Sequence, residues 1–580
     1  MNHRSLWLRI LIAALLASME LGGFLRLQTI LLHRSVPLTS MRGLMYLETY
    51  LAVCAAGLCF VLAPVALAAA EKLRTRWRTA YSVVGLAVLC AGMAVWVHHF
   101  GNQQFGSWDE GILIDTGWRQ MLGQHPYSSF VTPHPVGFCL GAYYAFRIFG
   151  VNWNAMLYLT ALLAIVGFLW TCWLLKQLTE RRIVALAGAL VVTLIVTLQV
   201  SFWWYNSVSE TFVIVFLLSS LLLLRKPESV AANASFLFAL LPLALMKPNM
   251  AGLAGVGCVA LLLATGPRVR VLLYSASAVA FTLLFLHFNH VSVGAMWSCY
   301  HAAAIERGLG HFGLRDYDRR NRLVLLLWLL PVGLPLLGAI RGLRQSFTHR
   351  RWNEAAQRLF VPYLALLGLY GIVSNNDLKS LEYLYLLLAA VLLAWGKGMP
   401  ERSAGFRRYV AALLCAFAVT GLYSTLIRER ILGIGMHDFY EEKNANLPVV
   451  DPFFADMRAS QRMDTVVQSL HRAVAENGGP YFFGPRIEMG YALTQHTSPD
   501  GLWISWEPGT TIARSAQTTM VERWKIRRFE TLVFLKETDG HYETIFYPQQ
   551  FLDIIQSGYA RDDSYPGLTV FHARAMQPNP

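Results

Sequence analysis

Repeated apolar segments of about 20 residues constrain this chain more than any other feature. A helix needs about 20 mostly apolar residues to cross the hydrocarbon core of a bilayer, where only helices and closed barrels satisfy their backbone hydrogen bonds. We therefore expect an α-helical polytopic membrane protein. The sequence contains thirteen candidate spans, at residues 6–25, 44–70, 80–97, 153–175, 183–200, 209–224, 231–247, 250–266, 271–288, 322–342, 359–373, 383–396 and 409–427.

The composition agrees with this class. Apolar residues make up 55% of the chain and charged residues 14%, whereas soluble domains are about 25% charged. Disordered, collagen-like and disulfide-scaffold classes are thereby excluded. The eight cysteines lie in or beside apolar segments, and the last is Cys415, which favours buried small side chains over disulfides.

The positive charge is confined to the apolar part of the chain. Residues 1–427 hold 34 Lys and Arg against 16 Asp and Glu, and residues 428–580 hold 15 against 19. With the N-terminus inside, the expected cytoplasmic segments carry 22 basic and 5 acidic residues, and the rest of the apolar half carries 12 and 11. The positive-inside rule explains this asymmetry, so the charge does not indicate nucleic-acid binding. We expect a bacterial inner-membrane protein with a cytoplasmic N-terminus and an extracytoplasmic C-terminus.

This orientation predicts two domains. Residues 1–427 form the transmembrane domain, with outer loops at 98–150 and 289–321, and with a helix at 136–150 that lies on the outer membrane surface. Residues 428–580 form an extracytoplasmic α/β domain, which we call the tail. Its expected elements are helices at 464–476 and 549–557 and strands at 481–483, 531–535 and 568–572.

Two adjacent carboxylates, Asp109 and Glu110, follow the third expected span, and Asp115 comes six residues after Asp109. Apolar neighbours raise the pKa of a carboxylate toward the working pH, which suits a general base. A solvated acidic loop can contain the same dipeptide, so the surrounding sequence has to decide.

That surrounding sequence contains further motifs. Gly123-Gln124-His125-Pro126-Tyr127 is a G-x-x-P-Y element, and an apolar segment led by Pro135 ends in Phe149-Gly150 directly before the next span. The order and spacing resemble the first outer loop of the GT-C superfamily, the membrane glycosyltransferases that use lipid-phosphate sugars. The likeness is strongest to the protein mannosyltransferase and lipid A aminoarabinose transferase group.

The resemblance covers residues 80–400 in pattern, with specific motifs only in 105–155. It implies a dozen spans, a catalytic acidic pair and a polyprenyl-phosphate donor. Two features depart from the group: two additional spans precede the acidic loop, and His134 stands where members often have Lys. The phosphate contact that family members make at this position therefore does not carry over directly, and His134 is kept as a candidate only.

Other polar residues at the expected outer surface are candidates for the same site. Glu210 begins the sixth span and has a counterpart in the resembling family, although an acidic cap at the membrane interface would look the same. Lys247 interrupts an apolar turn, where it either contacts a lipid phosphate or snorkels. The loop 289–321 is basic, and Arg forks suit phosphate oxygens or lipid headgroups. The candidate phosphate contacts are Lys247, Arg307, Arg315 and His134, and the candidate substrate contacts are Asp115, Tyr127 and His301.

The need for a metal stays open. Asp316-Tyr317-Asp318 is a D-x-D triplet, which in soluble sugar transferases binds a divalent metal such as Mg²⁺ or Mn²⁺. The neighbouring arginines can equally pair with these carboxylates, and no other cofactor motif is present.

These observations predict a membrane glycosyltransferase that transfers a sugar, with inversion, from a polyprenyl-phosphate donor to an extracytoplasmic glycolipid, protein or cell-envelope glycan. Asp109 is the first candidate for the base, Glu110 the second, and Glu210 a helper. Three alternatives remain: a transporter or flippase of lipid-linked glycans, a non-catalytic envelope scaffold, and a glycan polymerase or ligase with a diphosphate-linked donor. The sequence contains no matching halves of the kind that transporters show.

Overall fold

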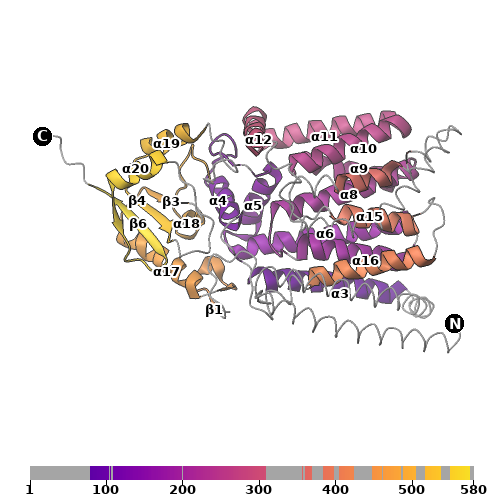
Figure 1. Cartoon of the computed structure of the whole chain (residues 1–580), viewed down its shortest axis with the longest axis horizontal. Helices are drawn as coiled ribbons and strands as arrows, with labels where there is room; N and C mark the ends of the chain where they lie inside the picture. Colours follow the sequence, from indigo (N-terminus) through magenta and orange to yellow (C-terminus); the bar gives the residue numbers. More distant parts are fainter. Residues whose placement is uncertain are drawn as a thin grey trace, which may run out of the picture.

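The computed structural model describes two parts of the chain, a helical half within residues 79–422 and the tail within residues 447–574, which lie side by side along the long axis (Figure 1). The expected spans at 6–25, 44–70 and 322–342 lie outside the described residues. The described residues are 79–103, 105, 109–132, 134–179, 181–198, 200–307, 356, 359–368, 383–396, 404–422, 447–459, 461–484, 487–504, 516–536 and 549–574.

The helical half is built from apolar helices that run roughly parallel to one another (Figure 1). Helix α6 packs against α3, α7 and α8, while α9 packs against α8 and α11. Each of these helices coincides with an expected span. Their bounds are α3 (Thr79–Gly101), α6 (Trp153–Thr179), α7 (Arg182–Thr193) with the π-helical stretch η1 (Leu194–Leu198), α8 (Tyr205–Arg225), α9 (Val230–Leu243), α10 (Pro248–Thr265), α11 (Arg268–Phe288), α15 (Tyr383–Trp395) and α16 (Ala404–Leu422).

Four of the described helices are long and apolar enough, by length and composition, to cross a membrane. They are Val83–Gly101 within α3, and α6, α8 and α11. Six further apolar helices among the described residues are 10 to 17 residues long. The expected number of thirteen spans is therefore not confirmed, although the helical character of the expected segments is.

Three helices lie between the apolar bundle and the tail in sequence segments that we expected to be largely loop. They are α4 (Asp109–Met121), α5 (Val136–Phe149) and α12 (Val293–Arg307). Only α5 was expected as a helix. The outer loops proposed at 98–150 and 289–321 therefore contain two helices, α4 and α12, that the sequence did not predict, because short helices give no apolar run of spanning length. Figure 1 places α4 and α5 beside the tail and α12 near the end of α11.

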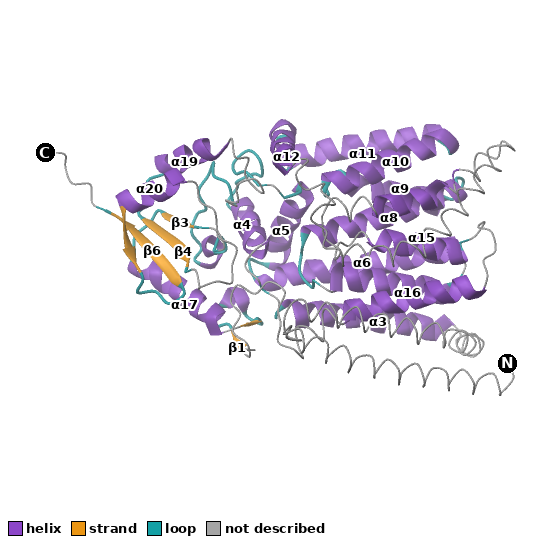
Figure 2. Ribbon diagram, viewed as in Figure 1, coloured by secondary structure: helices purple, strands orange, loops and turns teal. Residues whose placement is uncertain are grey.

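The strands of Figure 2 all belong to the tail, which has a four-stranded sheet in the order β3-β4-β6-β5. Strands β3 and β4 are parallel, and the other two pairs are antiparallel. The expected tail helices and strands are confirmed to within a few residues. The short elements β1, β2, β5, η3, α18 and α19 are additional. The boundary at residue 427 lies outside the described residues. The elements are β1 (Leu447–Pro448), η3 (Pro452–Phe454), β2 (Arg458–Ala459), α17 (Gln461–Glu476), β3 (Tyr481–Phe483), α18 (Gly490–Leu493), α19 (Gln517–Ile526), β4 (Thr531–Leu535), α20 (Gln549–Gly558), β5 (Tyr559–Asp562) and β6 (Leu568–Ala573).

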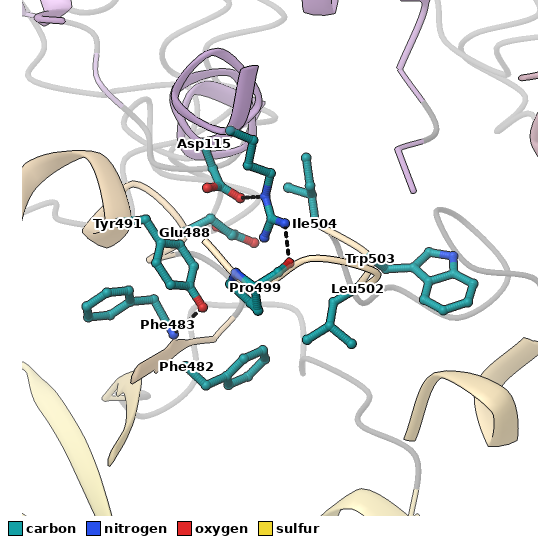
Figure 3. A pocket seen from close by; sticks show the side chains of 10 residues that line it. Asp115, Phe482, Phe483, Glu488, Tyr491, Pro499, Leu502, Trp503 and Ile504 are labelled. Atoms are coloured by element: carbon teal, nitrogen blue, oxygen red, sulfur yellow. Dashed lines mark hydrogen bonds and ion pairs between the residues drawn. The ribbon is translucent and has the colours of Figure 1, made fainter. Parts of the chain in front are cut away.

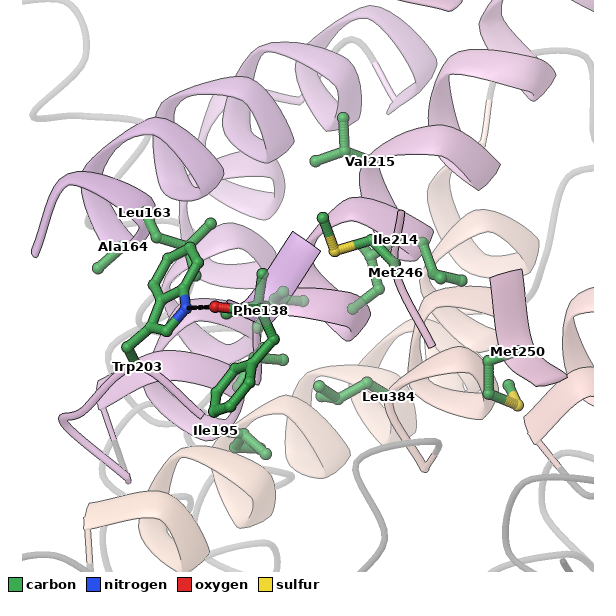
Figure 4. Close-up of a cluster of buried hydrophobic side chains, with 14 of the residues drawn as sticks. Phe138, Leu163, Ala164, Ile195, Trp203, Ile214, Val215, Met246, Met250 and Leu384 are labelled. Carbon is green, nitrogen blue, oxygen red and sulfur yellow. Dashed lines mark hydrogen bonds between the residues drawn. The ribbon is translucent and has the colours of Figure 1, made fainter. Parts of the chain in front are cut away.

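Helix α5 is anchored to the apolar bundle by Trp203, which precedes α8. Its indole N–H donates to the carbonyl of Phe138 at 3.2 Å (Figure 4). The ring lies so close to Gly141 that a Cβ there would stand 2.5 Å from a ring carbon. A glycine is therefore needed at this position for α5 to rest on the indole.

Candidate functional site

The acidic pair opens helix α4. Asp109 is its first residue and Glu110 its second, a position where carboxylates are stabilised by the positive end of the helix dipole. Glu110 is only 5% exposed. The side chain of Asp109 lies outside the described part of the chain.

His134 precedes Pro135, the N-terminal cap of α5, and is 7% exposed. Its ring lies 5.3 Å from that of Tyr205 at the start of α8. The carbonyl of His134 accepts a hydrogen bond from the Tyr127 hydroxyl. The imidazole is thus held between the first turns of two helices, and the preceding loop is tied to it.

Tyr127, which is buried, and Tyr300, which is partly buried, form a phenol pair beside His134. Their hydroxyl oxygens are 3.0 Å apart, and the Tyr300 hydroxyl also accepts from the backbone N–H of Val136 at 3.1 Å. Burial raises the pKa of both phenols, so both are neutral hydroxyls at physiological pH. Tyr127 has a φ of 66°, a left-handed backbone conformation that is uncommon for a residue with a large side chain.

Glu210 lies in the second turn of α8 and is 1% exposed. The hydroxyl of Tyr385 on α15 donates to its carboxylate. A buried carboxylate requires such partners because a charge without them is expensive to remove from water. The pairing brings a segment from late in the helical half to the start of α8.

Lys247 caps the N-terminus of α10 and is half-buried. Its backbone N–H donates to the hydroxyl of Ser209 at 3.0 Å, and Ser209 is the residue before Glu210. The same turn meets α5, because the N–H of Gly137 donates to the carbonyl of Leu245 at 2.8 Å. We call Tyr127, His134, Glu210, Lys247 and Tyr300 the His134 cluster.

The acidic pair lies away from this cluster along the helices. Helices α4 and α5 pack antiparallel, with the Gln120 side chain donating to the carbonyl of Cys139 at 2.9 Å. A Cβ on Gly117 would meet the ring of Phe146, one to two turns further along α5. Asp109 and Glu110 therefore lie at the end of α4 that is farther from His134. The structure brings four candidates, Tyr127, His134, Glu210 and Lys247, together with Tyr300, and it places the acidic pair at the opposite end of the α4–α5 contact from His134.

Asp115 is completely buried, in an ion pair with Arg119 four residues later on α4. The Nε of Arg119 lies 2.7 Å from one carboxylate oxygen (Figure 3). The Ser498 hydroxyl from the tail donates to the other oxygen at 2.7 Å. Burial raises the pKa of the Asp115 carboxyl, and Arg119 and Ser498 act against that rise. Both oxygens of Asp115 are occupied, so its geometry fits a role in holding α4 to the tail.

The remaining candidates are less constrained. His301 is exposed on α12, and Arg307 ends that helix with a side chain outside the described part. Arg315, Asp316 and Asp318 lie outside the described residues. Within the described ranges, no group of three or more His, Cys, Asp or Glu side chains is placed to hold a metal ion.

Comparisons with known proteins gave similarity at the level of structure. The chain is similar to a crystal structure of ArnT from Cupriavidus metallidurans bound to undecaprenyl phosphate, with a TM-score of 0.47 and 11% identity over 87% of this chain and 100% of that chain. It is also similar to ArnT of the same organism in the apo state, with a TM-score of 0.45 and 13% identity over 84% and 98%. No protein-family model and no curated protein sequence matches the chain.

Proposed function

We propose that the chain is a membrane glycosyltransferase that transfers a sugar from a polyprenyl-phosphate donor to an acceptor at the extracytoplasmic face of the membrane in which it lies. The observation that carries the proposal is the His134 cluster, which joins His134 before α5, Glu210 on α8, Lys247 before α10 and the Tyr127–Tyr300 pair. The proposal rests on this chain's own residues and motifs.

The cluster has the chemistry needed for a lipid phosphate. The Lys247 ammonium and the His134 imidazole can donate to anionic oxygens. The two phenol hydrogens are already used, that of Tyr127 on the His134 carbonyl and that of Tyr300 on the Tyr127 oxygen, so the phenols hold the loop that carries His134. In the proposed reaction, the acceptor oxygen attacks the anomeric carbon and the bond from that carbon to the phosphate oxygen breaks. Polyprenyl phosphate leaves as an anion, and the cluster stabilises the charge that develops on it.

The acceptor proton must pass to a carboxylate. The motif assigns this role to Asp109, with Glu110 second. The geometry adds Glu210, whose neighbour Ser209 accepts the hydrogen bond from Lys247. A base has to lie within hydrogen-bond reach of the attacking hydroxyl. The position of the donor phosphate therefore decides whether the acidic pair or Glu210 is the base. With the phosphate on Lys247 and His134, Glu210 is nearer to the reaction.

The experiment that tests the class of reaction compares cell-envelope glycolipids and glycoproteins by mass spectrometry in cells with and without the gene. The proposal expects loss of one sugar from one class of acceptor and return of that sugar on complementation. An unchanged envelope with normal membrane insertion of the protein contradicts it.

A transporter is distinguished by a second measurement on the purified full chain. Sugar transfer in detergent, where no gradient exists, supports the enzyme. Movement of intact lipid-linked sugar across vesicles, without a change in its covalent structure, contradicts the enzyme and supports the transporter.

A further inference from the structure

The tail contacts the candidate site through one short segment, residues 496–504, which we call the clamp segment. It follows α18 and lies against the end of α4 and the loop that leads to His134. Its backbone and its Ser498 side chain make hydrogen bonds to residues more than 370 positions earlier in the chain. These contacts indicate a role for the tail that the sequence motifs do not.

The side chains of α4 supply one half of this contact. Arg119 is 2% exposed and its Nε pairs with Asp115. One terminal nitrogen of the guanidinium donates to the carbonyl of Pro499 at 2.6 Å, and the guanidinium lies between the rings of Phe130 and Tyr491, 5.4 and 5.8 Å from their centroids. A buried cation is stabilised only when its donors are used, and here the tail uses one of them.

Ser498 closes the same network. It is completely buried, its hydroxyl donates to Asp115, and its carbonyl accepts from the side-chain amide of Gln124 at 2.6 Å. Figure 3 shows Asp115 facing the tail, with Pro499 and Tyr491 around the pair. Removing Ser498's hydroxyl therefore leaves a buried carboxylate oxygen with one donor fewer.

The loop before His134 supplies the other half. The N–H of Gly501 donates to the carbonyl of Ser129 at 2.5 Å, and Val131 accepts from Ile504 and donates to Leu502, both at 3.2 Å. This is a short strand-like ladder. Tyr127 lies two residues before the first residue of this ladder, Ser129, and His134 lies three residues after its last, Val131.

The ladder is backed by a small apolar cluster of Ile112, Phe130 and Ile504. Ile112 belongs to the first turn of α4, two residues after Glu110. The clamp segment therefore contacts the elements that carry both predicted groups, the acidic pair and the His134 cluster.

We propose that the clamp segment positions Tyr127 and His134 for the donor phosphate, so that the tail is part of the donor site. Ser498 is then a positioning residue, which acts through Asp115, Gln124 and the ladder at Ser129–Val131. This inference rests on the proposed function. It predicts that a small change in the clamp segment alters use of the donor and leaves use of the acceptor unchanged.

The test uses the purified full chain with Ser498→Ala, with Ser498→Thr as the conservative variant, and with Ser557→Ala as a matched control. The hydroxyl of Ser557 is exposed and bonds within α20, so it does not touch the clamp segment. The measurements are KM for a polyprenyl-phosphate sugar, KM for the acceptor, kcat, and hydrogen exchange of residues 124–134.

The proposal expects Ser498→Ala to raise the donor KM or lower kcat about tenfold, with faster exchange of residues 124–134 and an unchanged acceptor KM. Ser498→Thr restores most of the loss, and Ser557→Ala behaves like the wild type. Unchanged donor kinetics in Ser498→Ala overturn the clamp and leave the proposed function standing. Equal changes in donor and acceptor KM also overturn it, because they indicate a general loss of structure. A wild type that transfers no sugar from any lipid-linked donor overturns the proposed function, and the clamp's role falls with it.

Discussion

Gly137 is the position where a single methyl group tests the His134 cluster most sharply. It lies in the first turn of α5, and its N–H donates to the carbonyl of Leu245, two residues before Lys247. A Cβ at Gly137 would stand 2.7 Å from that carbonyl oxygen and 2.9 Å from the Met246 methyl. Gly137→Ala therefore forces the turn that carries Lys247 away from α5.

The size of the effect follows from these contacts. Ordinary contacts of a Cβ begin near 3.4 Å, so the turn has to move by roughly 0.7 Å. Overpacking of this kind costs about 1–3 kcal/mol, and the better helix propensity of alanine returns about 0.5–1 kcal/mol. A net loss of at most about 2.5 kcal/mol in the free energy of unfolding is expected. A displacement near 1 Å lowers catalysis about 100-fold.

The assay measures donor kcat/KM and thermal unfolding of the purified chain in detergent. Gly252→Ala is the matched control, because Gly252 lies on α10 itself and a Cβ there meets nothing within 4 Å. We expect Gly137→Ala to lose activity with only a modest loss of stability, and Gly252→Ala to lose neither. If Gly137→Ala has wild-type kinetics, activity does not depend on the close approach of α5 to the turn that carries Lys247, and the reasoning is refuted.

Three further predictions concern single residues. Glu210→Gln and Glu110→Gln are expected to differ in kcat. The general base is the residue whose replacement lowers kcat by about 10²–10⁴-fold. If both variants keep the wild-type kcat, Asp109 is left as the base. Lys247→Met is expected to raise the donor KM and reduce its dependence on ionic strength, measured by initial rates over a salt series; an unchanged salt dependence contradicts a phosphate contact. Burial and the facing ring of His290 lower the pKa of His125. The unfolded chain therefore binds a proton more readily, and the stability of the folded chain falls as the pH drops below about 6.5. His125→Asn should flatten this pH dependence in melting curves between pH 7.5 and 5, and equal slopes for the variant and the wild type would exclude His125 as its source.

Much of the architecture could be predicted from the sequence, because apolar periodicity and turn residues act locally. The strand Thr531–Leu535 has the bounds that the sequence predicted, and α5 ends within one residue of its expected end. Helix α4 was missed, since its thirteen residues mix Asp, Glu and Arg with apolar side chains. Its only available signal was the i,i+4 spacing of Asp115 and Arg119, which favours a helix.

The sequence predicted which residues belong to the candidate site better than it predicted how they are arranged. The motif selected His134, Glu210 and Lys247 from distant segments, and the structure joins them through Tyr205, Ser209 and the α5 first turn. The burial of Asp115 by Ser498 could not be predicted, because 383 residues separate the two. No local pattern encodes a contact between an outer loop and the tail, which depends on how the whole chain packs.

The most direct measurement of the central claim is transfer of a radiolabelled sugar by the purified full chain in detergent, with a panel of polyprenyl monophosphate and diphosphate donors and an envelope lipid extract as acceptor. The account predicts label in the acceptor and one released polyprenyl phosphate for each sugar transferred, from a monophosphate donor only, with loss of turnover in Lys247→Met. Transfer from diphosphate donors alone, or no transfer from any donor by protein that is folded by its melting curve, contradicts it.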